Sequence, residues 1–112
     1  MRIAIPLAEG KLADPLQRCQ EVALVDIDPH TGIVQGRRST PVPPDTPAVV
    51  PEWLADQGAQ VLIVGSMGRR ERDRFSGRGI RTVFGAPPET PGQLVAAYVA
   101  GRLRSQQDVD EP

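Results

Sequence analysis

The pattern of hydrophobic and polar positions is clearest in the middle of the chain. Residues 61–64 (Val-Leu-Ile-Val) form a continuous apolar run of strand length, which is typical of a strand that is covered on both faces. A turn of small residues at 65–68 leads into a charged stretch at 69–74, which predicts a solvated helix. Two glycines end this helix, and residues 80–84 predict the next strand. Strand, turn, helix and strand together predict a right-handed parallel crossover in an α/β sheet.

The pattern before this unit predicts three strands and one long loop. Residues 2–7 form a short first strand and residues 22–28 a second. Between them, residues 8–20 show no sustained periodicity and are expected to form a long loop. Residues 28–32 (Asp-Pro-His-Thr-Gly) have strong turn chemistry. The second strand and a polar third strand at residues 33–38 should therefore form an antiparallel hairpin whose outer strand is an edge.

Two further helices are predicted, one on each side of the central unit. The first begins near Thr46 or Val50, because Pro51 cannot donate a backbone hydrogen bond deep inside a helix, and it ends at Gly58. The last helix begins after Thr90, where Thr-Pro-Gly-Gln has the capping-box pattern with proline at the first helical position. The apolar stripe of the last helix consists of Leu94, Val95, Tyr98, Val99 and Leu103.

These elements assemble into one small α/β domain. A chain of 112 residues is long enough for one core; we assign residues 1–104 to the domain and residues 105–112, which are polar and acidic, to a frayed tail. The expected architecture is a five-stranded mixed sheet in the order 3-2-1-4-5, with helices on both faces. In that order the chain leaves the first and fourth strands in opposite directions, so a crevice forms between their carboxyl ends. A site there would use residues 7–19 and 65–70.

Composition limits the possible partners and the compartment. Thirteen Lys and Arg residues nearly balance 14 Asp and Glu residues, so no general attraction to nucleic acid or to an anionic membrane is expected. Cys19 is the only cysteine, which excludes an intrachain disulfide and favours a reducing compartment. No apolar run approaches the roughly 18 to 20 residues of a membrane span, and the N-terminus lacks a signal-peptide core. We therefore expect a cytoplasmic protein.

The glycine turn after the central strand is a candidate anion site. Gly65, Ser66 and Gly68 would place backbone N–H groups and a helix N-terminus at the crevice, beside the guanidinium groups of Arg69 and Arg70. The turn matches neither GxxxxGK[ST] nor a full GxGxxG, so nucleotide binding has little support. The alternative interpretation is that the glycines only let a strand turn into a helix and that the arginines form a solvated face.

Arg18 and Cys19, in the long loop, would approach the same crevice if the loop folds back over it. A thiolate beside an arginine has a lowered pKa and can ligate iron or attack an electrophile. The alternative is that Cys19 is an ordinary small side chain, because it has no neighbouring His or Cys with which to share a metal.

Catalytic constellations find little support in the sequence. The only histidine, His30, lies in the hairpin turn, so no Ser/His/Asp triad can form. Asp26 and Asp28 alternate on the second strand, but the first strand has no carboxylate, which argues against a two-metal nuclease. A phosphate-ester enzyme would have only Glu9 or Asp14 as a general base in the crevice. We expect a protein that is not an enzyme.

Several segments together resemble the dinitrogenase iron-molybdenum cofactor-binding family. They are Met1-Arg2-Ile3-Ala4-Ile5-Pro6, the strand end at residues 25–28, residues 53–65, the Met67-Gly68 turn, Gly79-Ile80 and residues 83–86. The resemblance implies a ribonuclease H-like fold and a small accessory protein of nitrogen fixation. Such a protein binds the iron-molybdenum cofactor, or its iron-sulfur precursor, while nitrogenase is assembled.

The chain departs from the family pattern at two places. The family's His-Phe-Gly-Arg-Ala segment aligns with residues 15–19, where Pro15 replaces the suspected cluster-contacting histidine and only Arg18 matches. Ser66 replaces the second glycine of the family's Gly-Gly-Met-Gly turn. Cys19 lies near the missing histidine and is a possible soft ligand.

The leading hypothesis is a non-catalytic binding or carrier module that holds an anionic metal cluster in the crevice. Backbone groups of the turn would donate hydrogen bonds, Arg18 and Arg69 would supply charge, and Cys19 would be the metal ligand. Possible partners are nitrogenase, cofactor-assembly proteins or a second copy of the chain. The alternative is a protein-interaction domain of the same fold that has lost its ligand and pairs through residues 33–38 or the arginine-rich helix.

Overall fold

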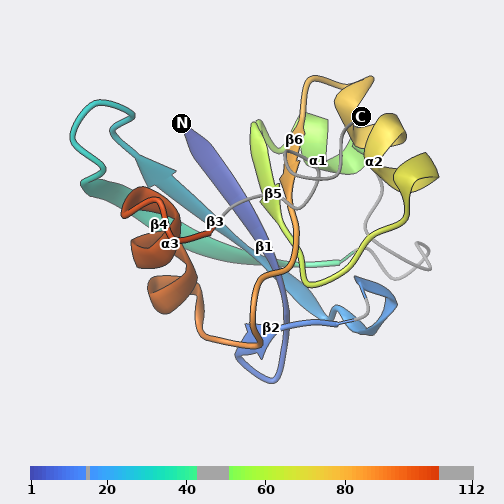
Figure 1. Ribbon diagram of the computed structural model, residues 1–112, viewed down its shortest axis with the longest axis horizontal. Coiled ribbons are helices and arrows are strands. Elements are labelled where there is room, and N and C mark those ends of the chain that lie inside the picture. The colour runs from blue at the N-terminus through green and yellow to red at the C-terminus, as the bar shows by residue number, and fades with distance from the viewer. Residues whose placement is uncertain (15, 43–50, 104–112) are drawn as a thin grey trace.

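The computed structural model describes residues 1–14, 16–42 and 51–103 (Figure 1). The position of Pro15, the expected helix start at Thr46 or Val50, and the expected tail at residues 105–112 lie outside the described residues. The described elements are β1 (Arg2–Ala8), β2 (Lys11–Leu12), the 3₁₀ helix η1 (Leu16–Arg18), β3 (Glu21–Ile27), β4 (Val34–Pro41), α1 (Pro51–Asp56), β5 (Val61–Ile63), α2 (Arg69–Ser76), β6 (Arg81–Val83) and α3 (Pro91–Val99).

The strands form one mixed sheet whose main path runs β4-β3-β1-β5-β6. Strands β3 and β4 are an antiparallel hairpin, as predicted, and β1 pairs antiparallel with β3. Strand β5 lies parallel between β1 and β6, which confirms the predicted parallel strand at the centre of the chain. Its residues pair with β1 at Ile3↔Val61 and Ala4↔Leu62.

The expected count of five strands is wrong, because the sheet has six strands in the described residues. The additional strand, β2, forms within the segment that the sequence predicted as a loop, and it pairs back onto β1. Glu9 and Gly10 make the connecting two-residue turn, and both have positive φ (56° and 82°), as a primed hairpin turn requires. A strand of two residues leaves no periodic pattern in a sequence, so hydrophobic periodicity could not reveal it.

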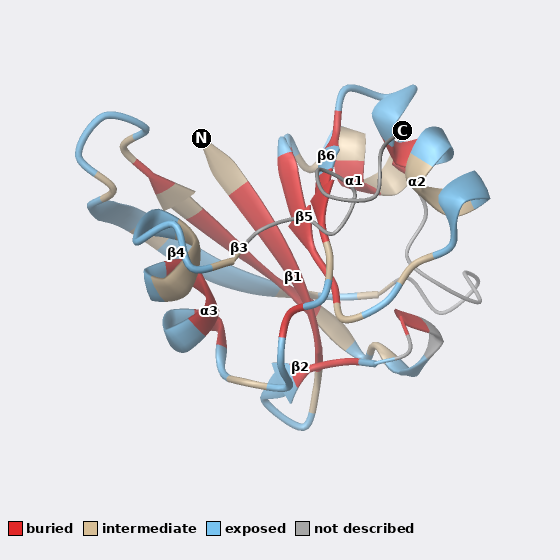
Figure 2. Cartoon of the chain, in the orientation of Figure 1, coloured by how far each residue is buried: buried red, intermediate tan, exposed pale blue. Residues whose placement is uncertain are grey.

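Helices cover both faces of the sheet (Figure 2). Helix α3 packs on one face, where Leu94 and Val95 join a buried cluster with residues of β1, β3, β5 and β6. Helices α1 and α2 pack on the other face through Leu54 and Phe75. Every residue of β5 is buried, which explains why its sequence is apolar throughout rather than alternating.

The predicted start of α3 is confirmed and its predicted end is not. The Thr90 side chain accepts a hydrogen bond from the Gln93 backbone N–H, and the Gln93 side chain accepts one from Thr90. This is the predicted capping box, with Pro91 as the first helical residue. The helix ends at Val99, before Gly101 takes a φ of 76°, so Leu103 packs against the core from beyond the helix.

Arg2, on β1, forms hydrogen bonds with β3 and with the residue that follows α1. Its Nε donates to Asp26 Oδ1 at 2.7 Å and its Nη2 donates to Asp26 Oδ2 at 3.1 Å. Its Nη1 donates to the carbonyl oxygen of Gln57 at 2.6 Å, just beyond α1. The hydrogen bonds from Arg2 hold the pKa of Asp26 below its usual range.

The Arg2–Asp26 pair predicts a pH-dependent stability. Because the pKa of Asp26 is lowered by folding, its stabilisation is present above the unfolded pKa and is lost as the pH falls through the folded pKa. Both side chains are about a third exposed (31% and 38%), so Asp26→Asn should cost about 1 kcal/mol at pH 7. The cost should shrink below about pH 4, measured by urea unfolding at several pH values.

The control for this experiment is Glu52→Gln, which removes a more exposed ion pair with Arg78. That variant should change the free energy of unfolding much less. A cost for Asp26→Asn that stays constant down to pH 3 would show that the ion pair is not its source.

Thr82 is a buried polar residue on β6. It is 3% exposed, and its hydroxyl has no hydrogen-bond partner among the described residues. Burying an unpaired hydroxyl costs free energy. Thr82→Val should therefore raise the free energy of unfolding by about 1 kcal/mol, with an unchanged denaturant m value. Thr82→Ser, which keeps the hydroxyl and removes the methyl, should lower it, and a stabilising Ser variant would contradict the argument.

Candidate functional site

The site predicted at the carboxyl ends of β1 and β5 is bridged by Asp14. The Ser66 hydroxyl, in the turn after β5, donates to Asp14 Oδ1 at 2.9 Å. Gly65 leaves the space that the carboxylate occupies, since a Cβ at this position would lie 2.7 Å from Asp14 Oδ2. The segment after β1 and the turn after β5 therefore meet, and we call this contact the Asp14–Ser66 junction.

Buried neighbours hold Asp14 in position. Leu12 and Ala13, which precede it, are 4% and 2% exposed. The Ala13 backbone N–H donates to the carbonyl oxygen of Pro6 at 2.9 Å, and that of Leu12 donates to Glu89 at 3.0 Å. Asp14 itself is exposed at the end of this anchored stretch. Sequence reasoning named Asp14 only as a possible general base and missed its bridging role; the pairing of a small residue at the end of β5 with a carboxylate in the loop gave no local signal.

Arg18 shares a small cavity with Asp14. The cavity has a volume of about 170 Å³. Its lining residues are Ala8, Glu9, Leu12, Ala13, Asp14 and Arg18. Arg18 is the last residue of η1 and is exposed. Counting described residues only, one guanidinium group and two carboxylates thus surround the same hollow, directly beside the Asp14–Ser66 junction.

Cys19 is directed toward the core instead. Its thiol donates to the carbonyl oxygen of Glu21 at 3.0 Å, and its side chain packs against the buried cluster beneath α1 and α2. It is not one of the residues that line the cavity of Arg18. Burial raises the pKa of the Cys19 thiol. The expected lowered pKa is therefore wrong, because desolvation of the thiol outweighs its backbone hydrogen bonds with Leu7 and Glu21.

The start of α2 supplies the donors predicted at the glycine turn. Gly68 precedes the helix in an extended conformation, and no side chain caps the helix there. The first N–H groups of such a helix lack intrahelical acceptors, and the helix dipole favours negative charge beside them. Arg69 and Arg70 are exposed in the first turn. The Gly65 carbonyl accepts from the Gly85 N–H at 2.8 Å, which fixes the turn against the end of β6.

The described residues contain no group of three or more His, Cys, Asp or Glu side chains arranged to hold a metal ion. His30 is exposed in the β3–β4 turn, as predicted, and its backbone N–H donates to Asp28 Oδ1 at 2.8 Å. Among residues 1–14, 16–42 and 51–103, no helix combines the length and the apolar character that a membrane span requires. The polar groups that the candidate site offers are therefore arginine side chains and backbone N–H donors.

Comparison with known proteins identifies the family. The family model described as "Dinitrogenase iron-molybdenum cofactor" matches residues 1–101. The chain belongs to this family. None of the curated proteins matches the chain. The resemblance drawn from the sequence is thus confirmed, over almost the whole length of the chain.

Solved structures share the fold of this dinitrogenase cofactor family member. The crystal structure of PH0822 aligns with a TM-score of 0.82 at 25% identity and covers 100% of both chains. A candidate dinitrogenase from Methanocaldococcus jannaschii aligns with a TM-score of 0.72 at 16% identity, covering 92% of this chain and 91% of that one. The apo form of the orange protein from Desulfovibrio gigas aligns with a TM-score of 0.69 at 20% identity, covering 93% and 91%.

The position of Cys19 predicts a slowly reacting thiol. Because folding raises its pKa and leaves its side chain only partly exposed, iodoacetamide should modify Cys19 several-fold more slowly in the folded protein than in denaturing urea at pH 8. The rate in the folded protein should also rise at a higher pH than the rate in urea. A folded protein that reacts faster than the unfolded chain would mean that the thiolate is activated.

Proposed function

We propose that this protein is a non-catalytic carrier that binds an anionic metal cluster, the iron-molybdenum cofactor or its iron-sulfur precursor, during nitrogenase cofactor assembly. Membership of the family supports the cofactor theme. The observation that carries the proposal is the Asp14–Ser66 junction, which brings the loop after β1 next to the turn that leads into α2. Arg18 follows the first of these segments, and Arg69 begins the helix after the second.

The donors present suit an anion better than a bare metal ion. Arg18 and Arg69 supply positive charge, and Gly65, Ser66 and Gly68 form the turn that leads to the uncapped start of α2. Charge-assisted hydrogen bonds of this kind recognise anionic oxygen or sulfur without forming metal bonds. Without a set of three ligating side chains in the described residues, a cluster would retain most of its own ligands. Such binding is reversible, as a carrier requires.

Cys19 has a smaller part in this proposal than the sequence suggested. Before its sulfur could ligate a metal, the thiol would have to break its hydrogen bond to Glu21 and lose its proton against a raised pKa. We therefore propose that recognition rests on Arg18, Arg69 and the turn, and that Cys19 ligates only after the cluster has arrived. Removing Cys19 should weaken binding less than removing the charge of Arg18.

Asp14 opposes the binding of an anion. Its carboxylate lies against Gly65 and accepts a hydrogen bond from the Ser66 hydroxyl. That hydroxyl is then not available to an anion, and the carboxylate adds negative charge to the site. A carrier gains from this opposition, because a cluster that is held too tightly cannot be delivered. Asn at this position keeps an oxygen that accepts from Ser66 and removes only the charge.

The experiment is an anaerobic titration of the protein with isolated iron-molybdenum cofactor, followed by absorbance. Arg18→Gln should weaken binding by about tenfold, and Asp14→Asn should tighten it by about threefold. Cys19→Ala should have a smaller effect than Arg18→Gln. The matched control is Arg102→Gln, which changes an exposed arginine beyond α3 and should leave affinity unchanged.

The absence of binding by the wild-type protein would contradict the proposal. Equal losses of affinity for Arg18→Gln and Arg102→Gln would also contradict it, because affinity would then depend on net charge and not on the position of the arginine in the site. A dominant loss in Cys19→Ala would show that the thiol is the principal ligand.

A further inference from the structure

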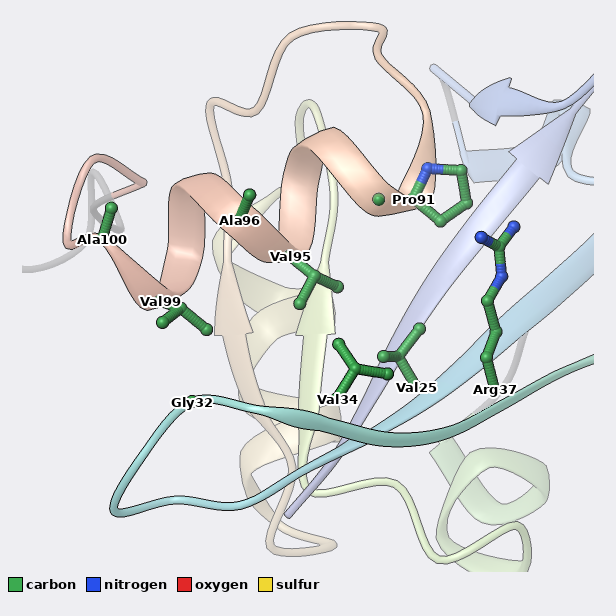
Figure 3. Close-up of a pocket in the computed structure, with 10 residues that line it drawn as sticks. Val25, Gly32, Val34, Arg37, Pro91, Val95, Ala96, Val99 and Ala100 are labelled. Carbon is green, nitrogen blue, oxygen red and sulfur yellow. The ribbon is translucent and has the colours of Figure 1, made fainter.

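A second hollow lies on the α3 face of the sheet, between that helix and the edge strand β4 (Figure 3). It has a volume of about 440 Å³, which is within the usual range for ligand and peptide pockets. Its floor includes Val25, Val34 and Arg37, and α3 contributes Val95 and Val99. We call it the α3–β4 groove.

The groove exists because α3 is too short to cover its face of the sheet. The helix has nine residues, and β4 lies at the edge of the sheet, two strands from β1. Val34 is 52% exposed, Val99 is 44% exposed, and Ile33 beside the groove is 64% exposed. These are the exposed large hydrophobic residues of the described chain, and their concentration at one place is typical of an interaction surface.

One end of the groove is positively charged. Arg37 pairs in register with Val25, so it projects on the same face, and Figure 3 shows it beside Pro91 at the start of α3. In the part of the chain that the structure describes, the Arg37 guanidinium makes no hydrogen bond or ion pair. The positive end of the α3 dipole lies at the same place. Among the residues that the structure describes, no acidic side chain lines the groove, so a carboxylate of a partner would complement this end.

The open edge of β4 adds a backbone surface. Every second N–H and C=O of an edge strand points away from the sheet and can pair with another chain. Arg37 and Arg38 argue against a second copy of this chain, because antiparallel pairing of two β4 strands would bring their arginines together. An extended peptide that carries a carboxylate avoids this repulsion.

We propose that the α3–β4 groove binds an extended, acidic peptide segment of a partner protein, which adds as a strand to β4. Alternate apolar side chains of the segment would cover Val34 and Val99, and a carboxylate would pair with Arg37. The groove is formed by β3, β4 and α3, whereas the Asp14–Ser66 junction lies beyond the ends of β1 and β5. A partner can therefore hold the protein while the cluster site stays open.

The test uses isothermal titration calorimetry with the full chain and the peptide acetyl-Val-Thr-Val-Thr-Glu-Thr-amide, whose two valines and glutamate share one face of an extended strand. Arg37→Gln should weaken binding by about tenfold. Arg38→Gln is the matched control, because Arg38 pairs in register with Leu24 and donates to the Gln57 side chain, on the opposite face of the sheet; it should leave the affinity unchanged. Val99→Asp, at an exposed position, should abolish binding.

Two control peptides separate the contribution of the peptide's charge from that of its backbone hydrogen bonds. A peptide with Lys in place of Glu should bind at least tenfold more weakly, because it repels Arg37. A peptide with N-methylated alternate amides should not bind, because it cannot pair with β4. The proposal is overturned if the Lys and Glu peptides bind equally, if the N-methylated peptide binds as well as the parent, or if Arg37→Gln and Arg38→Gln have equal effects. It is also overturned if the free chain forms a dimer, measured by light scattering, that Val99→Asp disrupts.

Discussion

The structure depends on the parallel pairing of β1 with β5. The pairs Ile3↔Val61 and Ala4↔Leu62 join residues that are 3% exposed or less, and the two pairs contribute to the cores on opposite faces of the sheet. Burial of both faces requires apolar side chains at every position of β5, and the sequence supplies them. This pairing joins residues about 60 positions apart and fixes where each strand ends.

The direction in which the chain leaves these two strands creates the proposed cluster site. From β1 the chain passes to β2 and then to β3, toward one edge of the sheet. From β5 it passes through α2 to β6, at the other edge. The space between the strand ends is closed by Asp14, which contacts Ser66 and Gly65. The same topology leaves β4 as an edge that α3 only partly covers. One arrangement of strands thus produces two separate surfaces, the proposed anion site and the proposed peptide groove.

Much of the fold could be predicted from the sequence, because buried strands and capped helices have local signals. The apolar run of β5, the turn of the β3–β4 hairpin and the capping box at Thr90 are each complete within a few residues. Strand β2 has no such signal, since it is a two-residue strand that depends on pairing with β1. The position of Asp14 and the orientation of Cys19 depend on contacts with distant segments or with the core, so spacing along the chain could not predict them.

The central claim is that a cluster binds where the loop after β1 meets the turn before α2. Paramagnetic broadening of backbone amide signals during anaerobic addition of iron-molybdenum cofactor tests this claim most directly, because it reports position as well as affinity. We predict loss of signal at residues 8–14 and 16–19 and at residues 65–70, with β4 and α3 unaffected. Broadening centred on β4 or α3, or spread evenly over the surface, would contradict the account.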